Sequence, residues 1–337
     1  MSDANVATIE RLVMDTLGPQ AGVKALGALA IDAALLAETG ETVSRAGFAM
    51  ALNVLLFDDL LKRVPSGAAY VADTVARGER ITFDHGALRT IRFREGPTGA
   101  LPAGQDAFQR ILEPLGYHVA DTYPLPALRM TGRAYCHRDA PETIPQFFVS
   151  ELHVERFDEG FVRVAERVFG TTRDPLSADA QDVLAAFAAD GSAPYPDALH
   201  ALPAILACFD CHHEAVSLGD YEALLARSGE AAWIATEGNA FNHATDRVAD
   251  VDAHAARLKA EGRPMKDKVE VSSSGRVRQT AFRADTFERK FAGGVRRTVP
   301  GSFYEFITRD VDPATDGLDL RFDSGNATGI FAMTRAA

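Results

Sequence analysis

Cysteine, tryptophan and long apolar runs are all scarce in this 337-residue sequence, which has three cysteines and one tryptophan. An odd, sparse set of cysteines does not suit a disulfide framework and favours a compartment in which thiols stay reduced. No stretch reaches the roughly 18 consecutive apolar residues of a transmembrane helix. The N-terminus, MSDANVATIERLVMDTLG, lacks the basic start and apolar centre of a signal peptide. These absences predict a cytoplasmic protein with no membrane partner.

Basic charge is also in short supply, because 47 acidic residues face 35 basic ones and the net charge is −12. Binding to a phosphate backbone requires a basic face, so no nucleic-acid partner is expected. The sequence also lacks a glycine-rich phosphate loop and a G-x-S-x-G motif, which argues against nucleotide-binding and serine-hydrolase functions. The apolar share of 47% is ordinary for a globular protein with a buried core.

Two kinds of hydrophobic period alternate along the chain. The first 60 or so residues carry apolar side chains at helical spacing. From Ile81 to Phe93 the period changes to two, as in a strand, and places His85 and Arg89 on one mostly apolar face. Residues from about 158 to 230 again have helical character, and a second series of strands and one helix begins near residue 240. The order of these segments predicts an α+β fold.

The two strand-rich series repeat the same landmarks. The motif H-x3-R opens the first series at His85 and the second at His243. Glu151 follows the first histidine by 66 residues, and Glu305 follows the second by 62. Matching residues at matching offsets predict a duplicated βαβββ module, with the first and last strands of both copies around one central cleft.

We therefore divide the sequence into four segments. Residues 1–70 form an N-terminal helical region, and 71–157 form the first βαβββ-like module. Residues 158–232 form a helical insert, and 233–337 form the second βαβββ-like module. The sequence gives no indication of the oligomeric state.

His85, His243 and Glu305 are candidate metal ligands. Glu305 shares a strand face with two apolar residues, and a carboxylate in such surroundings usually has a partner, for which a metal is one choice. Two histidines and one carboxylate with open positions form a triad that suits non-haem Fe(II). Each histidine taken alone is equally compatible with a hydrogen-bonded role in the core.

Arg89 and Glu151 leave two interpretations open. A charged arginine on an inward strand face needs an anion beside it. That anion is either the Glu151 carboxylate, which makes both residues structural, or the carboxylate of a bound substrate. Glu151 is also a candidate for an additional metal ligand or base, and a site of two histidines and two glutamates would have fewer open positions.

A cysteine–histidine cluster, Cys208-Phe-Asp-Cys211-His212, matches the spacing of a c-type haem attachment site. It falls inside an expected helix and has no export signal, so we interpret the match as a coincidence. A zinc site would need a second cysteine or histidine pair at a suitable spacing, and none is found in the sequence. The cluster is expected to be structural.

Five segments of the sequence together resemble one family. They are FDHGALRTI (83–91), GRAYCHRDAPETIPQFFVSEL (132–152), FNHATDRV (241–248), SGRVRQTAF (274–282) and VPGSFYEFITR (299–309). In this order and spacing they resemble the 2-oxoadipate dioxygenase/decarboxylases, also called hydroxyglutarate synthases. The resemblance covers most of the chain outside the helical insert.

The resemblance implies a vicinal-oxygen-chelate-like, glyoxalase-like core with added helices. It also implies Fe(II) held by His85, His243 and Glu305, with zinc or manganese as replacements after purification, and it places Arg89 on the substrate carboxylate. Family members use O2 to convert 2-oxoadipate to 2-hydroxyglutarate and CO2 in lysine breakdown. The chain departs from the bacterial members in having little sequence after Glu305, which leaves the particular 2-oxo acid open.

Two other functions compete with this expectation. A glyoxalase-type isomerase or lyase would need a divalent metal without oxygen chemistry. A non-catalytic module could hold a small acid while the histidines are structural. The expected partners of the dioxygenase are a small 2-oxo acid and O2. Contact of Glu151 with the metal would favour the isomerase, and absence of metal binding in the purified protein would favour the module.

Overall fold

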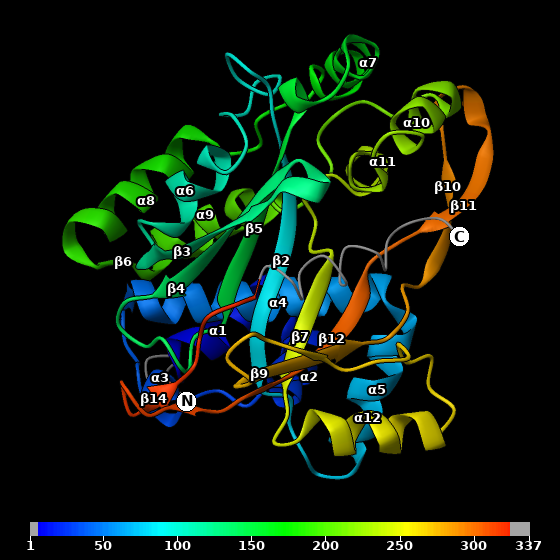
Figure 1. Ribbon diagram of the computed structural model, residues 1–337. Helices are drawn as coiled ribbons and strands as arrows, with labels where there is room; N and C mark the ends of the chain where they lie inside the picture. The colour runs from blue at the N-terminus through cyan, green and yellow to red at the C-terminus, as the bar shows by residue number, and fades with distance from the viewer. Residues whose placement is uncertain (1–5, 324–337) are drawn as a thin grey trace.

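One curled sheet of eight strands runs through the molecule, with helices packed against it (Figure 1). The computed structural model describes residues 6–323. Across the sheet the strands are β3 (Tyr117–Leu125), β4 (Met130–His137), β5 (Gln146–His153), β2 (Phe83–Arg92), β7 (His243–Arg247), β12 (Phe303–Arg309), β9 (Val277–Ala281) and β8 (Glu270–Val271). The prediction of a mixed α+β fold is confirmed.

The sheet consists of two halves that repeat one order of elements. In the first half, β2 is followed by α6 (Asp106–Leu112), β3, β4 and β5. In the second half, β7 is followed by α12 (Val251–Ala260), β8, β9 and β12. The first strand of each half pairs in parallel with its last strand, and β2 and β7 pair antiparallel to join the halves. A hairpin, β10 (Thr286–Lys290) and β11 (Arg296–Pro300), interrupts the second half.

Between residue 6 and the first strand of the sheet the chain forms five helices: α1 (Thr8–Leu17), α2 (Pro19–Ala28), α3 (Ala33–Leu36), α4 (Arg45–Arg63) and α5 (Pro65–Ala76). The longest, α4, starts at Ser44, whose side chain accepts a hydrogen bond from the Gly47 amide. Phe57 of α4 packs on Phe83 and Tyr304 at ring distances of 5.0 and 6.2 Å. This helix therefore covers the convex face of the central strands, behind the sheet in Figure 1.

The insert supplies five more helices: α7 (Glu159–Phe169), α8 (Ala178–Asp190), α9 (Tyr195–Ala207), α10 (Leu218–Leu225) and α11 (Gly229–Glu237). Its short strand β6 (Ser192–Pro194) pairs with β1 (Thr42–Ser44) of the N-terminal region. Phe187 of α8 also packs on Phe48 of α4, with ring centroids 4.9 Å apart. Insert and N-terminal helices thus share one core, and the division into four segments stays a prediction.

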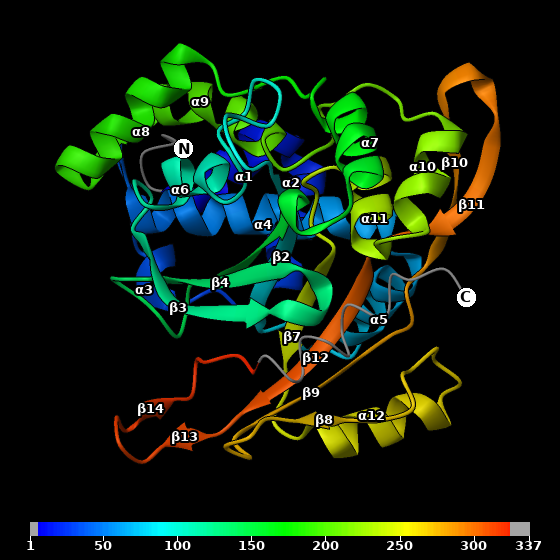
Figure 2. The same cartoon turned by 45° about the horizontal axis from the view of Figure 1, so that its top comes forward.

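The two faces of the sheet carry different side chains. The convex face is apolar and joins the main core through residues such as Leu88, Val149 and Phe306. The concave face carries His85, Arg89 and Glu305, all of them buried. Figure 2 shows this face curving toward the viewer above the short strands β13 (Val311–Asp312) and β14 (Gly317–Leu318). Between residues 6 and 323, no helix combines the length and apolar character needed to cross a bilayer.

Candidate metal centre

Three adjacent strands bring His85, His243 and Glu305 together. The two Nε2 atoms lie 3.3 Å apart. Oε2 of Glu305 lies 3.4 Å from Nε2 of His85 and 3.1 Å from Nε2 of His243. Because β2, β7 and β12 are neighbours in the sheet, residues separated by 158 and 220 positions in the sequence can point one atom each at a common place.

The donor set fits a divalent metal. His85, His243 and Glu305 have exposed fractions of 2%, 5% and 0%. Oε2 of Glu305 accepts a hydrogen bond of 2.8 Å from Thr245, whereas Oε1 has no hydrogen-bond partner among residues 6–323. A buried carboxylate oxygen without a donor is costly, and a bound cation offsets that cost. Two imidazoles and one carboxylate leave further coordination positions open.

Asp84 fixes the orientation of His85. Its Oδ1 lies 2.8 Å from Nδ1 of the imidazole, which places the ring proton there and leaves the Nε2 lone pair for the cluster. A register shift between Phe83 and His85 forms a bulge in β2, and bulges change the direction of side chains. The Arg309 guanidinium in turn donates two hydrogen bonds of 2.9 Å to the carboxylate oxygens of Asp84.

His243 has a similar support. The Asn242 amide nitrogen lies 3.0 Å from Nδ1, and the imidazole stacks on Phe303 with ring centroids 4.8 Å apart. Oδ1 of Asn242 is buried and has no hydrogen-bond partner among the described residues. Half a turn of the amide places Oδ1 against Nδ1–H of His243. That arrangement satisfies both groups and again leaves Nε2 facing the cluster.

The cluster sets the charges of its members. Burial raises the pKa of Glu305, but the adjacent His243 and His85 outweigh it and hold the pKa well below the usual value. Burial lowers the pKa of His85, but hydrogen bonds to Asp84 and Glu305 raise it above the usual value. The pKa of His243 is lowered by burial, and the charge of Arg89 acts in the same direction. Glu305 is therefore ionised, as a metal ligand must be.

Arg89 lies on β2, four residues beyond His85, and is completely buried. Its guanidinium carbon lies 4.9 Å from the ring centre of Trp233 on α11. This cation–π contact helps to orient the guanidinium. The charge is close enough to lower the pKa of His243. Arg89 is thus a fixed cation beside the candidate metal site.

Glu151 points to the other face of the sheet, because it lies opposite Thr90 in the register. Its Oε2 lies 2.7 Å from Nε of Arg92 and accepts a hydrogen bond from the Gln105 amide. Its Oε1 lies 3.4 Å from Arg133. Glu151 therefore holds α6 and β4 to β2, and a role as an additional metal ligand or base does not fit this position.

The structural counterpart of Glu305 is Phe148. Glu305 lies two residues beyond the partner of His243 in the β7–β12 register. Phe148 lies two residues beyond the partner of His85 in the β2–β5 register. Gly132 on β4 leaves room for the Phe148 ring, because a Cβ there would clash with it. The first half thus presents an aromatic ring where the second half presents a ligand.

The cysteine–histidine cluster lies elsewhere and is held by backbone contacts. The ring nitrogens of His212 and His213 hydrogen-bond to backbone carbonyl groups. Burial raises the pKa of the Cys208 thiol to about 12 and that of the Cys211 thiol to about 11, so both stay protonated at neutral pH. Within residues 6–323 these side chains do not form a group of metal-ligating atoms.

We therefore expect Cys208→Ser with Cys211→Ser to keep one metal ion per chain. The reason is that neither thiol belongs to the group of ligating atoms that His85, His243 and Glu305 form. Elemental analysis of the purified double variant beside the parent protein checks this. A loss of metal at unchanged fold, judged by circular dichroism, would place the metal site in the insert.

Sequence reasoning missed the groups that support the ligands. Asp84, Asn242 and Trp233 were not among the predicted site residues. A signal exists for two of them, because FDH and FNH put an acid or its amide directly before each histidine. Nothing comparable marks Trp233, which approaches Arg89 from α11.

The curled sheet, with a buried group of two histidines and one glutamate on its central strands, is similar to the fold of a glyoxalase superfamily protein. A crystal structure from Ralstonia eutropha JMP134, of a protein assigned to the glyoxalase superfamily, is 50% identical with a TM-score of 0.87. The alignment covers 94% of this chain and 98% of that one.

The sequence profile of the 2-oxoadipate dioxygenase/decarboxylase family matches residues 55–327, and the chain belongs to this family. The chloroplastic 2-oxoadipate dioxygenase/decarboxylase of Arabidopsis thaliana is 24% identical over 76% of this chain and 69% of its own length. The hydroxyglutarate synthase of Oryza sativa in complex with 2-oxoadipate has a TM-score of 0.65 at 22% identity, and it shares the fold over 86% of this chain and 93% of its own. The expected family membership is confirmed.

Proposed function

We propose that this protein is an Fe(II)-dependent dioxygenase that decarboxylates a small 2-oxo acid, with conversion of 2-oxoadipate to 2-hydroxyglutarate and CO2 as its reaction. The observation that carries the proposal is the convergence of His85, His243 and Glu305. The Oε1 atom of this glutamate is buried and lacks a donor within residues 6–323. Family membership supports the reaction type, and the rice relative binds 2-oxoadipate. One O2 balances the conversion, since the acid loses one carbon as CO2 and gains one hydroxyl group.

The two histidines and Glu305 would hold the iron. When bound, Fe(II) supplies the redox chemistry by which O2 reacts with an organic acid. Asp84 and Asn242 keep both imidazoles directed at the ion. Glu305 provides one negative charge, which lowers the net charge of the dication in a site with little access to water.

Arg89 would bind a carboxylate of the substrate. Its planar fork can donate two parallel hydrogen bonds to a carboxylate, and the Trp233 ring holds that fork in place. The remaining concave wall is apolar and comprises Ala87, Tyr123, Ala134 and Phe148, with Phe322 packed against it. An apolar wall excludes water from the reacting groups and strengthens the charge pairing inside.

A metal-dependent isomerase or lyase is the second candidate, because the Ralstonia relative belongs to the glyoxalase superfamily. The aromatic ring of Phe148 in the place of a fourth ligand favours the dioxygenase. With three protein ligands, more positions stay open for a chelating acid and O2. A non-catalytic acid-binding module is a third candidate.

Oxygen uptake separates these candidates. The metal-free chain is reconstituted anaerobically with Fe(II), Mn(II) or Zn(II), and then mixed with O2 and 2-oxoadipate, 2-oxoglutarate or 2-oxohexanoate. We expect O2 consumption matched by CO2 release with Fe(II) alone, and fastest with a dicarboxylic acid. Turnover with Zn(II) in the absence of O2 would support the isomerase. Binding without turnover under all conditions would support the module.

A further inference from the structure

A short stretch of chain returns to the metal site after the last strand of the sheet. Residues Asp319–Phe322, here called the return segment, follow the β13–β14 hairpin. Nη1 of Arg309 donates 2.8 Å hydrogen bonds to the carbonyl oxygens of its first and third residues. Gln146 donates to the carbonyl of the second residue at 3.2 Å, and the hydroxyl of Tyr123 accepts from the amide of the fourth at 2.9 Å. Side chains from three strands therefore bind four successive residues.

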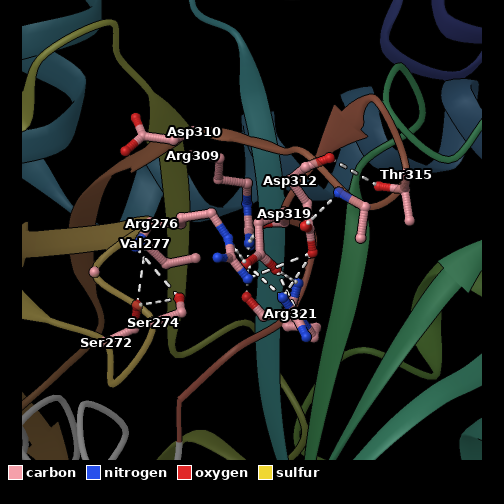
Figure 3. Close-up of polar contacts among 12 residues, drawn as sticks. Ser272, Ser274, Arg276, Val277, Arg309, Asp310, Asp312, Thr315, Asp319 and Arg321 are labelled. Atoms are coloured by element: carbon pink, nitrogen blue, oxygen red, sulfur yellow. Dashed lines mark hydrogen bonds and ion pairs between the residues drawn. The ribbon is translucent and has the colours of Figure 1, made fainter.

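Charged side chains hold the same segment from the outside. The Asp319 carboxylate is buried between Arg276 and Arg321, with Nε contacts of 2.9 and 2.8 Å. Arg321 also reaches Asp312 at 2.9 Å. Figure 3 shows the two guanidinium groups gathered around the Asp319 carboxylate. This network ties the return segment to β9 and to the β13–β14 hairpin.

Phe322, the last residue of the return segment, packs directly against the candidate metal ligand His85. The Phe322 ring meets the His85 imidazole edge to face, with ring centroids 4.8 Å apart at 88°. It also packs on Phe148 at 4.9 Å. Phe322 thus covers the side of the site where the first half of the sheet lacks a ligand.

The buried guanidinium of Arg309 contacts both Asp84, which supports His85, and the return segment. The Arg309 side chain has no exposed surface, and its Nε and Nη2 atoms bind the Asp84 carboxylate while Nη1 binds the return segment. Asp84 in turn holds Nδ1 of His85. Only arginine has the rigid fork that can serve two sets of acceptors at once, because a lysine ammonium is a single compact donor.

We propose that Arg309 is a positioning residue that couples docking of the return segment to the orientation of His85 through Asp84. Metal binding at His85 and closure of the site by Phe322 then stabilise each other. Such coupling is reciprocal, so whatever strengthens one must strengthen the other by the same free energy. The inference deepens the proposed function and rests on its metal site, but not on any substrate.

The test uses the metal-free full-length chain and Co(II) alone, under anaerobic conditions. Hydrogen exchange is measured on the peptide that contains the return segment, with and without Co(II), and the visible Co(II) spectrum reports the ligand geometry. In the parent protein we expect Co(II) to slow exchange at the Phe322 amide. In Arg309→Lys we expect Co(II) to bind about ten- to a hundredfold more weakly, with an altered spectrum and without that protection.

Arg278→Lys is the matched control. Arg278 lies opposite Thr308 on the neighbouring strand and forms a two-point pair with Asp310 at 2.8 and 3.0 Å, away from Asp84. It should behave as the parent does. Tyr123→Phe, which keeps the ring but removes the acceptor of the Phe322 amide, should reduce the Co(II)-dependent protection even if Arg309→Lys folds poorly.

Parent-like Co(II) affinity and protection in Arg309→Lys would overturn the coupling, as would an equal loss in Arg278→Lys. Unchanged protection in Tyr123→Phe would count against it as well. Absence of Co(II) binding in the parent would overturn both this inference and the proposed function. Normal coupling with Co(II) but no oxygen uptake with Fe(II) would overturn the proposed function alone.

Discussion

His243→Ala should yield a folded chain that contains almost no metal and consumes no oxygen. The substitution removes one of three ligands and leaves His85 and Glu305, which are too few to hold a divalent ion firmly. Elemental analysis gives the metal content per chain, and an oxygen electrode gives the activity with Fe(II) and 2-oxoadipate. The fold should persist because the main core lies on the other face of the sheet.

His137→Ala is the matched control for this experiment. His137 is equally buried, but Nε2 donates to the Leu115 carbonyl at 3.0 Å and the side chain lies away from the cluster. Its loss should lower thermal stability while the metal content stays at one ion per chain. Full metal content in His243→Ala would show that the ion binds elsewhere.

Arg89→Lys should lower kcat/KM for a dicarboxylic 2-oxo acid about ten- to a hundredfold. The substitution keeps the charge but loses the two-point fork, and a hydrogen bond to a charged group contributes about 1.5–3 kcal/mol. Metal content should be unchanged, since Arg89 is not a ligand. Steady-state oxygen uptake with 2-oxoadipate, set beside elemental analysis, measures both.

Arg92→Lys tests whether any arginine of this strand would behave alike. Arg92 lies three residues further along β2 and pairs with Glu151 and Asp106. That variant should keep a parent-like kcat/KM, with at most some loss of stability. If Arg89→Ala turns over 2-oxoadipate as fast as the parent, the arginine does not bind the substrate carboxylate.

Much of the fold is readable in the sequence because alternation and helical spacing reflect burial. The strand expected from Ile81 to Phe93 is β2, and the one helix expected in the second series is α12. The strand β3 was missed, because most of its side chains are exposed at a sheet edge and show no apolar alternation. The β10–β11 hairpin was missed for the same reason.

The candidate site could be predicted only where residues that recur in the two series also occupy equivalent positions in the two halves of the sheet. His85, His243 and Glu305 converge as the echo between the two series predicts. Counting residues from each histidine, however, paired Glu305 with Glu151, whereas the strand register pairs it with Phe148. Glu151 lies five residues beyond the strand partner of His85, whereas Glu305 lies two residues beyond the strand partner of His243. This difference of three positions places the two carboxylates on opposite faces of the sheet.

Contacts between residues far apart in the sequence are the other part of the site that could not be predicted. Arg309 and Asp84 are 225 residues apart, and nothing in either local sequence indicates that one guanidinium joins them. Likewise, the bulge at Asp84 interrupts the alternation that placed this side chain on the face opposite to His85. Contacts of this kind follow from the sheet order, which local periodicity does not determine.

An ion bound by His85, His243 and Glu305 would contribute to folding cooperativity, because the antiparallel pairing of β2 with β7 joins the two halves of the sheet. One ligand comes from the first half of the sheet and two come from the second, so neither half alone can complete the site. The binding free energy of an ion there would therefore also stabilise the association of the two halves of the sheet. At a free metal concentration of a hundred times Kd this linkage adds about 2.7 kcal/mol to the unfolding free energy. A chain depleted of metal should open first between β2 and β7.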